Sequence, residues 1–213
     1  MSPTEQKIID YAETITKPES DILKRVFRET NLKVMNPIML SGHLQGKLLQ
    51  FLSTMIKPRY VLEIGTYTGY SAICLAQGLQ KNGKLISIES NPELEDICRK
   101  NIADAKLGKS VELIIGDAKE IIPGLEKMFD LVYIDCDKEI YLDIYEMVFD
   151  KVAPGGFIIA DNVLWHGKIL DENEQTYKGT KEIAAFNEFV KNDERADNML
   201  LPFRDGLMLI RKY

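Results

Sequence analysis

Polar residues follow two β-branched runs of the chain, at the points where strands would end. Asp135 closes the run Leu131–Asp135, and Asp161 and Asn162 come directly after the run Gly156–Ala160. Neighbouring parallel strands lie about 4.8 Å apart, so residues at their carboxyl ends can converge on one site. Two carboxylates and an amide oxygen form a hard ligand set that suits Mg²⁺, with Mn²⁺ or Ca²⁺ as alternatives. The pattern therefore predicts an open metal site, in which water or substrate oxygens complete the coordination.

A simpler alternative explains part of this pattern, because Asp and Asn often cap the helix that follows a strand. Capping accounts easily for one of the acids. It accounts less well for Asp135, Asp137 and Lys138 after one strand combined with Asp161 and Asn162 after the next. The combination favours a site in which the carboxylates and the lysine act together.

A glycine loop follows the first β-branched run. The segment VLEIGTYTGYS, Val61–Ser71, turns through Gly65 and Gly69 into a helix, and glycine lets the backbone approach a ligand closely there. The spacing is G-x-x-x-G, whereas a dinucleotide fingerprint needs G-x-G-x-x-G, and a plain strand-to-helix turn stays open for the loop alone. Glu89, at the end of the next run, suits two ribose hydroxyls, and Asp117, after the third, lies near where an adenine would bind. Together these strand ends predict a nucleoside-containing cofactor.

The elements that position these residues are indicated by an alternation of short and long runs. From Arg59 onward β-branched runs alternate with amphipathic ones, which is typical of a parallel, doubly wound sheet with crossover helices. The predicted strands are Tyr60–Ile64, Lys84–Glu89, Val111–Ile115, Leu131–Asp135 and Gly156–Ala160. The predicted helices between them are Ser71–Leu79, one that starts at Asn91-Pro92 and stops at Gly108, Ala118–Lys127, and Lys138–Val152, the last ended by Pro154-Gly155-Gly156.

The two ends of the chain carry other elements. Residues 162–179 are predicted to form a polar loop, followed by a helix at Thr180–Asn192 and a hairpin that turns at Asp205-Gly206. Before residue 58 the pattern predicts helices at Glu5–Thr14, Ser20–Asn31 and about His43–Met55. These helices lie outside the βα alternation, so we expect them to cover the end of the sheet where open α/β sheets bind ligands.

Composition limits the class of protein. The 213 residues are 45% hydrophobic and 28% charged, with a net charge of −6, which fits one globular domain with its own core. The acidic balance argues against a nucleic-acid partner. No apolar run approaches the roughly 18 residues of a membrane span, and no leader segment is recognisable at the N-terminus. The cysteines Cys74, Cys98 and Cys136 lack a C-x-x-C spacing and predict reduced thiols in a cytoplasmic protein.

Several motifs together carry a resemblance to a known enzyme family. They are MLSGHLQGKLL (Met39–Leu49), VLEIGTYTGYSAICLA (Val61–Ala76), ISIESNPE (Ile86–Glu93), GDAKEIIPGL (Gly116–Leu125), FDLVYIDCDKEIY (Phe129–Tyr141), APGGFIIADNVLWHG (Ala153–Gly167) and LPFRDGLMLIRK (Leu201–Lys212). In this order they resemble the class I S-adenosylmethionine-dependent O-methyltransferases of the caffeoyl-CoA and catechol type. The resemblance implies a Rossmann-like, mostly parallel sheet of seven strands with a C-terminal antiparallel hairpin strand. It also implies a single methyltransferase domain over 1–213, with a helical cover at 1–57 and the core at 58–213.

The resemblance implies site residues at the matching positions. Asp135, Asp161 and Asn162 match the family's metal ligands, and Lys138 matches the lysine described as the base that takes a proton from the substrate hydroxyl. A phenol has a pKa near 10, and coordination to a dication favours the phenolate, so metal and lysine together would supply the nucleophile near neutral pH. The residues implied to contact S-adenosylmethionine are Ser41, Glu63, Gly65, Tyr67, Ser71, Glu89, Asp117 and Ala118, together with Asp135, which would serve both sites.

The implied reaction is methyl transfer to a hydroxyl of a small catechol-like or caffeoyl-type phenol, in an enzyme that forms a homodimer. Two alternatives remain open. A nicotinamide-dependent oxidoreductase is disfavoured by the missing third glycine. A regulatory protein that binds the cofactor without catalysis is disfavoured by the intact Lys138 and metal set.

Some conspicuous residues have ordinary explanations. His43 and His166 lack a second histidine or cysteine at ligand spacing, so we expect them at the surface or the rim of the site. Cys136 stands between two acids, which would raise the pKa of its thiol and disfavour a nucleophilic role. Trp165 is equally compatible with a substrate wall and with packing of its own loop. The departures from the family at His43, Gln45 and Cys136 leave the acceptor undetermined.

Overall fold

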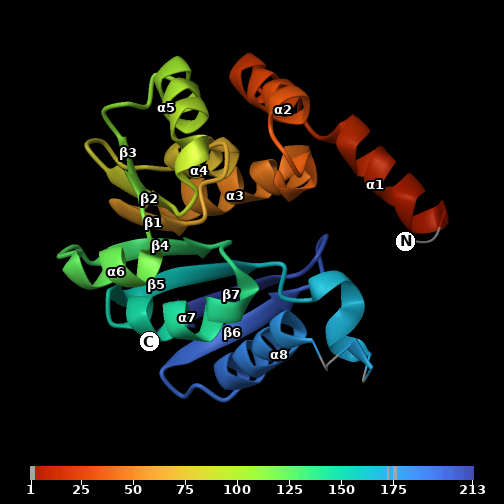
Figure 1. Ribbon diagram of the computed structural model, residues 1–213, viewed down its shortest axis with the longest axis vertical. Coiled ribbons are helices and arrows are strands. Elements are labelled where there is room, and N and C mark those ends of the chain that lie inside the picture. Colours follow the sequence, from red (N-terminus) through yellow and green to blue (C-terminus); the bar gives the residue numbers. More distant parts are fainter. Residues whose placement is uncertain (1–2, 172, 175–176) are drawn as a thin grey trace.

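The structure, a computed structural model, describes residues 3–171, 173–174 and 177–213, so residues 172 and 175–176 of the predicted loop at 162–179 lie outside the described residues. A 7-stranded sheet with the order β3-β2-β1-β4-β5-β7-β6 forms the centre of the fold (Figure 1). Strand β7 runs antiparallel to both of its neighbours, and the other pairs are parallel. The expected fold class is thereby confirmed. The strands are β1 (Tyr60–Ile64), β2 (Lys84–Glu89), β3 (Val111–Ile115), β4 (Phe129–Ile134), β5 (Val152–Asp161), β6 (Ala196–Leu201) and β7 (Leu207–Lys212).

The predicted strand boundaries hold residue for residue in β1, β2 and β3 and shift in the next two strands. Strand β5 begins at Val152 and includes Pro154-Gly155-Gly156, so the prediction that this tripeptide ends a helix was wrong. Pairing starts early because the Phe129 N–H donates to the Lys151 carbonyl at 2.8 Å. A register shift between Phe129 and Leu131 then accommodates the extra residues.

The helices are α1 (Pro3–Ile15), α2 (Asp21–Lys33), α3 (Gly42–Ile56), α4 (Tyr70–Ala76), α5 (Glu95–Asp104), α6 (Ala118–Ile121), α7 (Tyr141–Phe149) and α8 (Lys178–Lys191). Short 3₁₀ turns lie at η1 (Pro37–Met39), η2 (Pro92–Leu94), η3 (Ile122–Gly124), η4 (Lys138–Ile140) and η5 (Trp165–Leu170). Helix α6 is shorter than the predicted Ala118–Lys127, because Pro123 has no N–H for an intrahelical bond and the chain continues as a 3₁₀ turn. The predicted helix Lys138–Val152 likewise opens as η4 and ends at Phe149.

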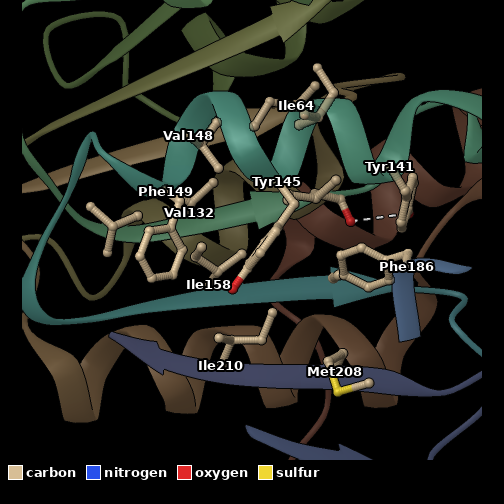
Figure 2. Packing of buried hydrophobic residues seen from close by; sticks show 14 of the residues in the cluster. Ile64, Val132, Tyr141, Tyr145, Val148, Phe149, Ile158, Phe186, Met208 and Ile210 are labelled. Atoms are coloured by element: carbon tan, nitrogen blue, oxygen red, sulfur yellow. Dashed lines mark hydrogen bonds between the residues drawn. The ribbon is translucent and has the colours of Figure 1, made fainter. Parts of the chain in front are cut away.

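Two apolar layers enclose the sheet (Figure 1). On one side α3, α4 and α5 supply buried residues, among them Leu49, Ile73 and Ile102. On the other side α7 and α8 cover the sheet, and Figure 2 shows Tyr145 and Phe149 lying between α7 and the strands. The Tyr145 and Phe186 rings meet edge to face with centroids 5.8 Å apart, a favoured aromatic geometry. No helix of the described residues is both long and apolar enough to cross a membrane.

The N-terminal helices differ in how they meet this core. Helix α3 packs on α4, and α2 contacts α4 and α5. Helix α1 has its main contact with α3 and projects from the rest of the structure (Figure 1). Helix α1 leaves Ile8, Tyr11 and Ile15 exposed on one face. Among the described residues of the predicted cover, 3–57, the end of α2, the start of α3 and the segment between them are the parts that reach the cavity described below.

The contact between α3 and α4 yields a first prediction. Gly78 follows α4, and a Cβ atom there would overlap the backbone and hydroxyl of Ser53, whose Oγ donates to the Leu75 carbonyl at 2.6 Å. Gly78→Ala is expected to lower the free energy of unfolding by about 2–3 kcal/mol, because backbone atoms cannot move aside as a flexible side chain does. Urea unfolding measures this. Gly108→Ala is the control, since its Cβ would meet open space, and equal losses in both variants would contradict the packing described.

Candidate active site

A cavity of about 1700 Å³ opens at the carboxyl ends of β1, β4 and β5. The sheet order reverses between β1 and β4, and such a switch point is where open α/β sheets hold ligands. The structure places every residue predicted for cofactor, metal and catalysis along this cavity except Glu63, which lies beneath it. The lining residues from this set are Ser41, Gly65, Tyr67, Ser71, Glu89, Asp117, Ala118, Asp135, Lys138, Asp161 and Asn162.

The first glycine of the loop, Gly65, is required on steric grounds. Gly65 has a φ of 99°, and its N–H donates to the Ile88 carbonyl at 2.9 Å. A Cβ atom at Gly65 would overlap the carbonyl of Asp135. Only glycine therefore allows the end of β1 to lie against the end of β4. At this contact the glycine loop after β1 meets the end of β4, where Asp135 lies.

Two acids stand beside the glycine loop in different environments. The carboxylate of Glu89 is buried and accepts the Tyr67 N–H at 2.7 Å and the Asn91 N–H at 2.9 Å. This fixes it at the end of β2 with acceptor capacity left for hydroxyl groups. Asp117 is exposed and caps α6 by accepting the Lys119 N–H at 2.8 Å, so its contact with the protein is that of a helix cap.

Glu63 is wholly buried under the loop. Its Oε2 accepts a hydrogen bond from Ser87 Oγ, while Oε1 has no partner among the described residues. Burial raises the pKa of this carboxyl to about 8, opposed by hydrogen bonds from Ser87 and Ser71 and supported by the charges of Asp135 and Glu89. A buried carboxyl with a free oxygen is poised to gain from a nearby cationic group.

This burial predicts a pH-dependent stability. The folded pKa of about 8 lies above the ordinary value of 4.5, so the neutral carboxyl stabilises the fold below pH 4.5 and that contribution is lost as the pH rises to 8. Glu63→Gln is expected to unfold with less pH dependence and to exceed the wild type by about 1–3 kcal/mol at pH 9. Thermal unfolding between pH 4.5 and 9 tests this, and parallel curves for the two proteins would contradict it.

Lys138 lies at the other half of the cavity, where it is 8% exposed. Its Nζ donates to Asp135 Oδ1 at 3.0 Å, to the Cys136 carbonyl at 3.1 Å and to Tyr141 Oη at 2.6 Å. These acceptors use the three N–H groups of an ammonium. Tyr141 Oη in turn donates to the Asp161 carbonyl at 2.8 Å. Lys138 is therefore held rigidly between the ends of β4 and β5.

Asp161 ends β5 and is 3% exposed. Burial and the neighbouring charge of Asp135 raise the pKa of its carboxyl to about 6, against the hydrogen bond from Tyr133, the charge of Lys138 and the backbone N–H of Asn162. Two carboxylates are thus close enough to repel each other, which a cation would relieve. Within the described part of the chain no group of three or more His, Cys, Asp or Glu side chains could hold a metal; the predicted set has two carboxylates and the amide of Asn162.

A comparison with protein families places this cavity in context. A profile described as O-methyltransferase matches residues 12–213. The chain belongs to the O-methyltransferase family. This confirms the resemblance drawn from the sequence motifs and the class of enzyme, and it favours an O-methyltransferase over the oxidoreductase alternative.

Relatives of this O-methyltransferase carry consistent names. A catechol O-methyltransferase of Niastella koreensis is 41% identical over 133 residues, which span 61% of this chain and 60% of that protein. A probable caffeoyl-CoA O-methyltransferase of Dictyostelium discoideum is 29% identical over 96% of this chain and 91% of its own. An O-methyltransferase structure from Bacillus cereus, in complex with SAH, is 29% identical, has a TM-score of 0.90 and covers 97% of each chain. A methyltransferase from Podospora anserina, bound to SAH, is 26% identical with a TM-score of 0.91, covering 99% of this chain and 95% of that one.

The two histidines and the tryptophan of this O-methyltransferase lie as follows. His43 does not line the cavity, and its Nε2 faces the Lys17 carbonyl at 3.0 Å. His166 is exposed at the rim, as expected, and stacks on Trp165 with centroids 5.8 Å apart. Trp165 both lines the cavity and packs against the core, so its two alternatives are compatible.

Sequence reasoning missed several residues of the site. Tyr133 and Tyr141 were read only as parts of a strand and a helix, and Arg204 only as part of a hairpin turn, yet each reaches Asp161 directly or through one other residue. A signal existed for Tyr133, because its hydroxyl lies within the apolar run Leu131–Ile134 of β4 and needs a buried partner. No signal in one sequence pairs Arg204 with Gln45.

Proposed function

We propose that this protein is an S-adenosylmethionine-dependent and divalent-metal-dependent O-methyltransferase that acts on a hydroxyl of a small catechol-like or caffeoyl-type phenol. The observation that carries the proposal is one cavity that joins two halves. One half holds the glycine loop and Glu89, and the other holds Asp135, Lys138 and Asp161. Family membership supplies the reaction class, and the names of the relatives support the acceptor class.

The cofactor half fits S-adenosylmethionine in charge and in hydrogen-bonding groups. The unpartnered Oε1 of Glu63 favours a cationic ligand, as a sulfonium or an α-ammonium group is. Glu89 keeps acceptor positions for ribose hydroxyls. Solved relatives from Bacillus cereus and Streptomyces achromogenes are described in complex with SAH and SAM, respectively. The contacts assigned to Ser41, Tyr67, Ser71, Asp117 and Ala118 are part of this proposal.

The acceptor half fits a divalent cation. Asp135, Asp161 and Asn162 would hold it, because they present hard oxygen ligands at one edge of the sheet and two of them are carboxylates whose charges repel. When bound, the ion supplies Lewis acidity that favours the phenolate form of the acceptor. Mg²⁺ is the first choice, with Mn²⁺ or Ca²⁺ as alternatives.

The residues of the chain then have defined tasks. As a base, Lys138 acts through its neutral amine: Nζ takes the proton of the acceptor hydroxyl and so becomes the ammonium that donates to Asp135. The acceptor oxygen attacks the methyl carbon of the sulfonium in line, the C–O bond forms as the C–S bond breaks, and S-adenosylhomocysteine leaves. The walls of the cavity hold the two reactants at near-attack distance, which is the main source of rate in such a transfer.

The proposal also covers the domain organisation, oligomeric state, location and partners of the whole protein. Residues 1–213 would form one methyltransferase domain with a helical cover at 1–57 and a core at 58–213. The exposed apolar faces of the N-terminal helices, including Ile8, Tyr11 and Met55, are compatible with a homodimer. The cysteines are free in the described structure, which fits a cytoplasmic location, and no nucleic-acid partner is expected from the net charge of −6.

The proposal is tested by a methyl-transfer assay over a set of phenols that differ in one hydroxyl. Catechol-type acceptors with vicinal hydroxyls are expected to be methylated, and their monohydric counterparts to react at least about tenfold more slowly, because only a vicinal pair offers two oxygens to the metal. Titration with S-adenosylmethionine alone serves as the control for cofactor binding. Tight cofactor binding without methyl transfer to any acceptor would support the regulatory alternative and reject the enzyme.

A further inference from the structure

Gln45 is the polar side chain through which helix α3 touches the end of β5. It is 2% exposed, and its Nε2 donates to Asp161 Oδ2 and, at 3.1 Å, to Tyr133 Oη. Tyr133 Oη donates to the same Asp161 oxygen at 2.6 Å. Gln45, Tyr133 and Asp161 therefore form a closed hydrogen-bonded ring beside the cavity.

Arg204 determines which way the Gln45 amide faces. Its Nη1 donates to Gln45 Oε1 at 3.0 Å, and a guanidinium has donors but no acceptor. The amide oxygen must therefore point to Arg204, which leaves both N–H groups for Tyr133 and Asp161. Arg204 has no ion pair with a carboxylate in the described parts of the chain, so its Nη1 donor is available to the Gln45 amide oxygen.

The hydrogen bonds of this ring determine how many acceptor positions of the Asp161 carboxylate remain open to another ligand. An ionised carboxylate offers about four acceptor positions. Oδ2 takes hydrogen bonds from Gln45 and Tyr133, and Oδ1 takes the Asn162 N–H at 2.7 Å. One position, on Oδ1, remains for another ligand. Without the Gln45 amide, Oδ2 would lose one of its two donors and the carboxylate could rotate.

We infer that Gln45 is a positioning residue for Asp161, and that Arg204 acts through Gln45 by fixing the orientation of its amide. The inference rests on the proposed metal site. Hydrogen-bonded partners of a metal ligand commonly set its orientation and affinity. Here Gln45 comes from helix α3, its anchor Arg204 from the turn between β6 and β7, and Tyr133 from β4, so three distant parts of the chain hold Asp161 in place.

The test measures Mn²⁺ binding to the full chain by electron paramagnetic resonance. Gln45→Met keeps the length of the side chain and removes its amide, and is expected to raise the Kd for Mn²⁺ about 10–100-fold. Gln50→Met is the matched control on the same helix, since Gln50 bonds to Gln77 and not to the site. The Kd for S-adenosylmethionine should stay within about twofold in both variants, which a general loss of structure would not allow.

Arg204→Met tests whether Arg204 acts through Gln45. This variant leaves helix α3 unchanged, so it stays informative if a substitution at Gln45 disturbs the fold. It is expected to weaken Mn²⁺ binding less than Gln45→Met does, and the double variant to bind like Gln45→Met alone, because the two residues act in series. Additive losses would overturn the role of Arg204. Wild-type affinity in Gln45→Met would overturn the inference while leaving the metal site intact, and a wild-type protein that binds no Mn²⁺ would reject the metal site itself.

Discussion

Replacing Asp161 by alanine is expected to reduce methyl transfer by about 10³-fold or more, while S-adenosylmethionine binding stays largely intact. The loss follows from the proposed mechanism, because Lewis-acid stabilisation is worth several kcal/mol and this carboxylate would be a ligand of the ion. Asp161 lies at the end of β5, whereas Glu89, the residue proposed to bind the ribose, lies at the end of β2. Steady-state rates with a catechol acceptor, combined with calorimetric titration of the cofactor, measure both parts.

The control for this change is Asp143→Ala. Asp143 is an exposed acid on α7 that pairs with Lys119 outside the site, and exposed pairs contribute little. Its variant should retain wild-type rates. If Asp161→Ala kept full activity in the presence of a chelator, the metal mechanism would be rejected, whatever the acceptor.

Replacing Lys138 by methionine is expected to lower kcat by about 10²–10⁴-fold, the usual contribution of a general acid or base. S-adenosylmethionine should still bind at the Glu89 half of the cavity, whereas the Kd for Mn²⁺ has to be measured as well, because Lys138 donates to Asp135, a proposed ligand of the ion. Removal of the ammonium also removes its 2.6 Å bond to Tyr141. The unfolding midpoint therefore has to be measured beside kcat, with Lys181→Met, an exposed lysine of α8, as the control.

Lys138→Arg separates two roles of the lysine. Arginine keeps the positive charge but does not give up its proton in proteins. If Lys138 acts as a base, Lys138→Arg should be about as slow as Lys138→Met. An arginine variant with most of the wild-type rate would show that the charge beside Asp135 is sufficient and that the proton leaves by another route.

The sheet was predictable because its signals are local. Runs such as Tyr60–Ile64 and Lys84–Glu89 are rich in aliphatic and β-branched residues and are bounded by turn residues, and the structure has strands with the same boundaries. The start of β5 was not predictable in the same way. Pro154-Gly155-Gly156 is a strong local stop signal, but the strand continues across it because Val152 before it pairs with Phe129 and Phe157 after it pairs with Leu131, contacts that the local sequence does not encode.

The same difference between local and long-range signals applies to the residues of the site. Asp135, Asp161 and Asn162 were found because parallel strands bring their carboxyl ends to one edge, a rule that needs only the strand assignments. The contact of Gln45 with Arg204 joins residues 159 positions apart in the chain, and no pattern within one sequence announces it. The burial of Glu63 under the glycine loop was missed for a related reason, since the residues of β1 do not show what covers either face of the strand.

The most direct test of the account is the rate of labelled methyl transfer from S-adenosylmethionine to a catechol, measured on chelator-treated protein as free Mg²⁺ is restored. If the two halves of the cavity form one metal-dependent active site, the rate should start near zero and rise to saturation, with cofactor affinity unchanged throughout. A full rate in the absence of any divalent ion, unaffected by its return, would contradict the account.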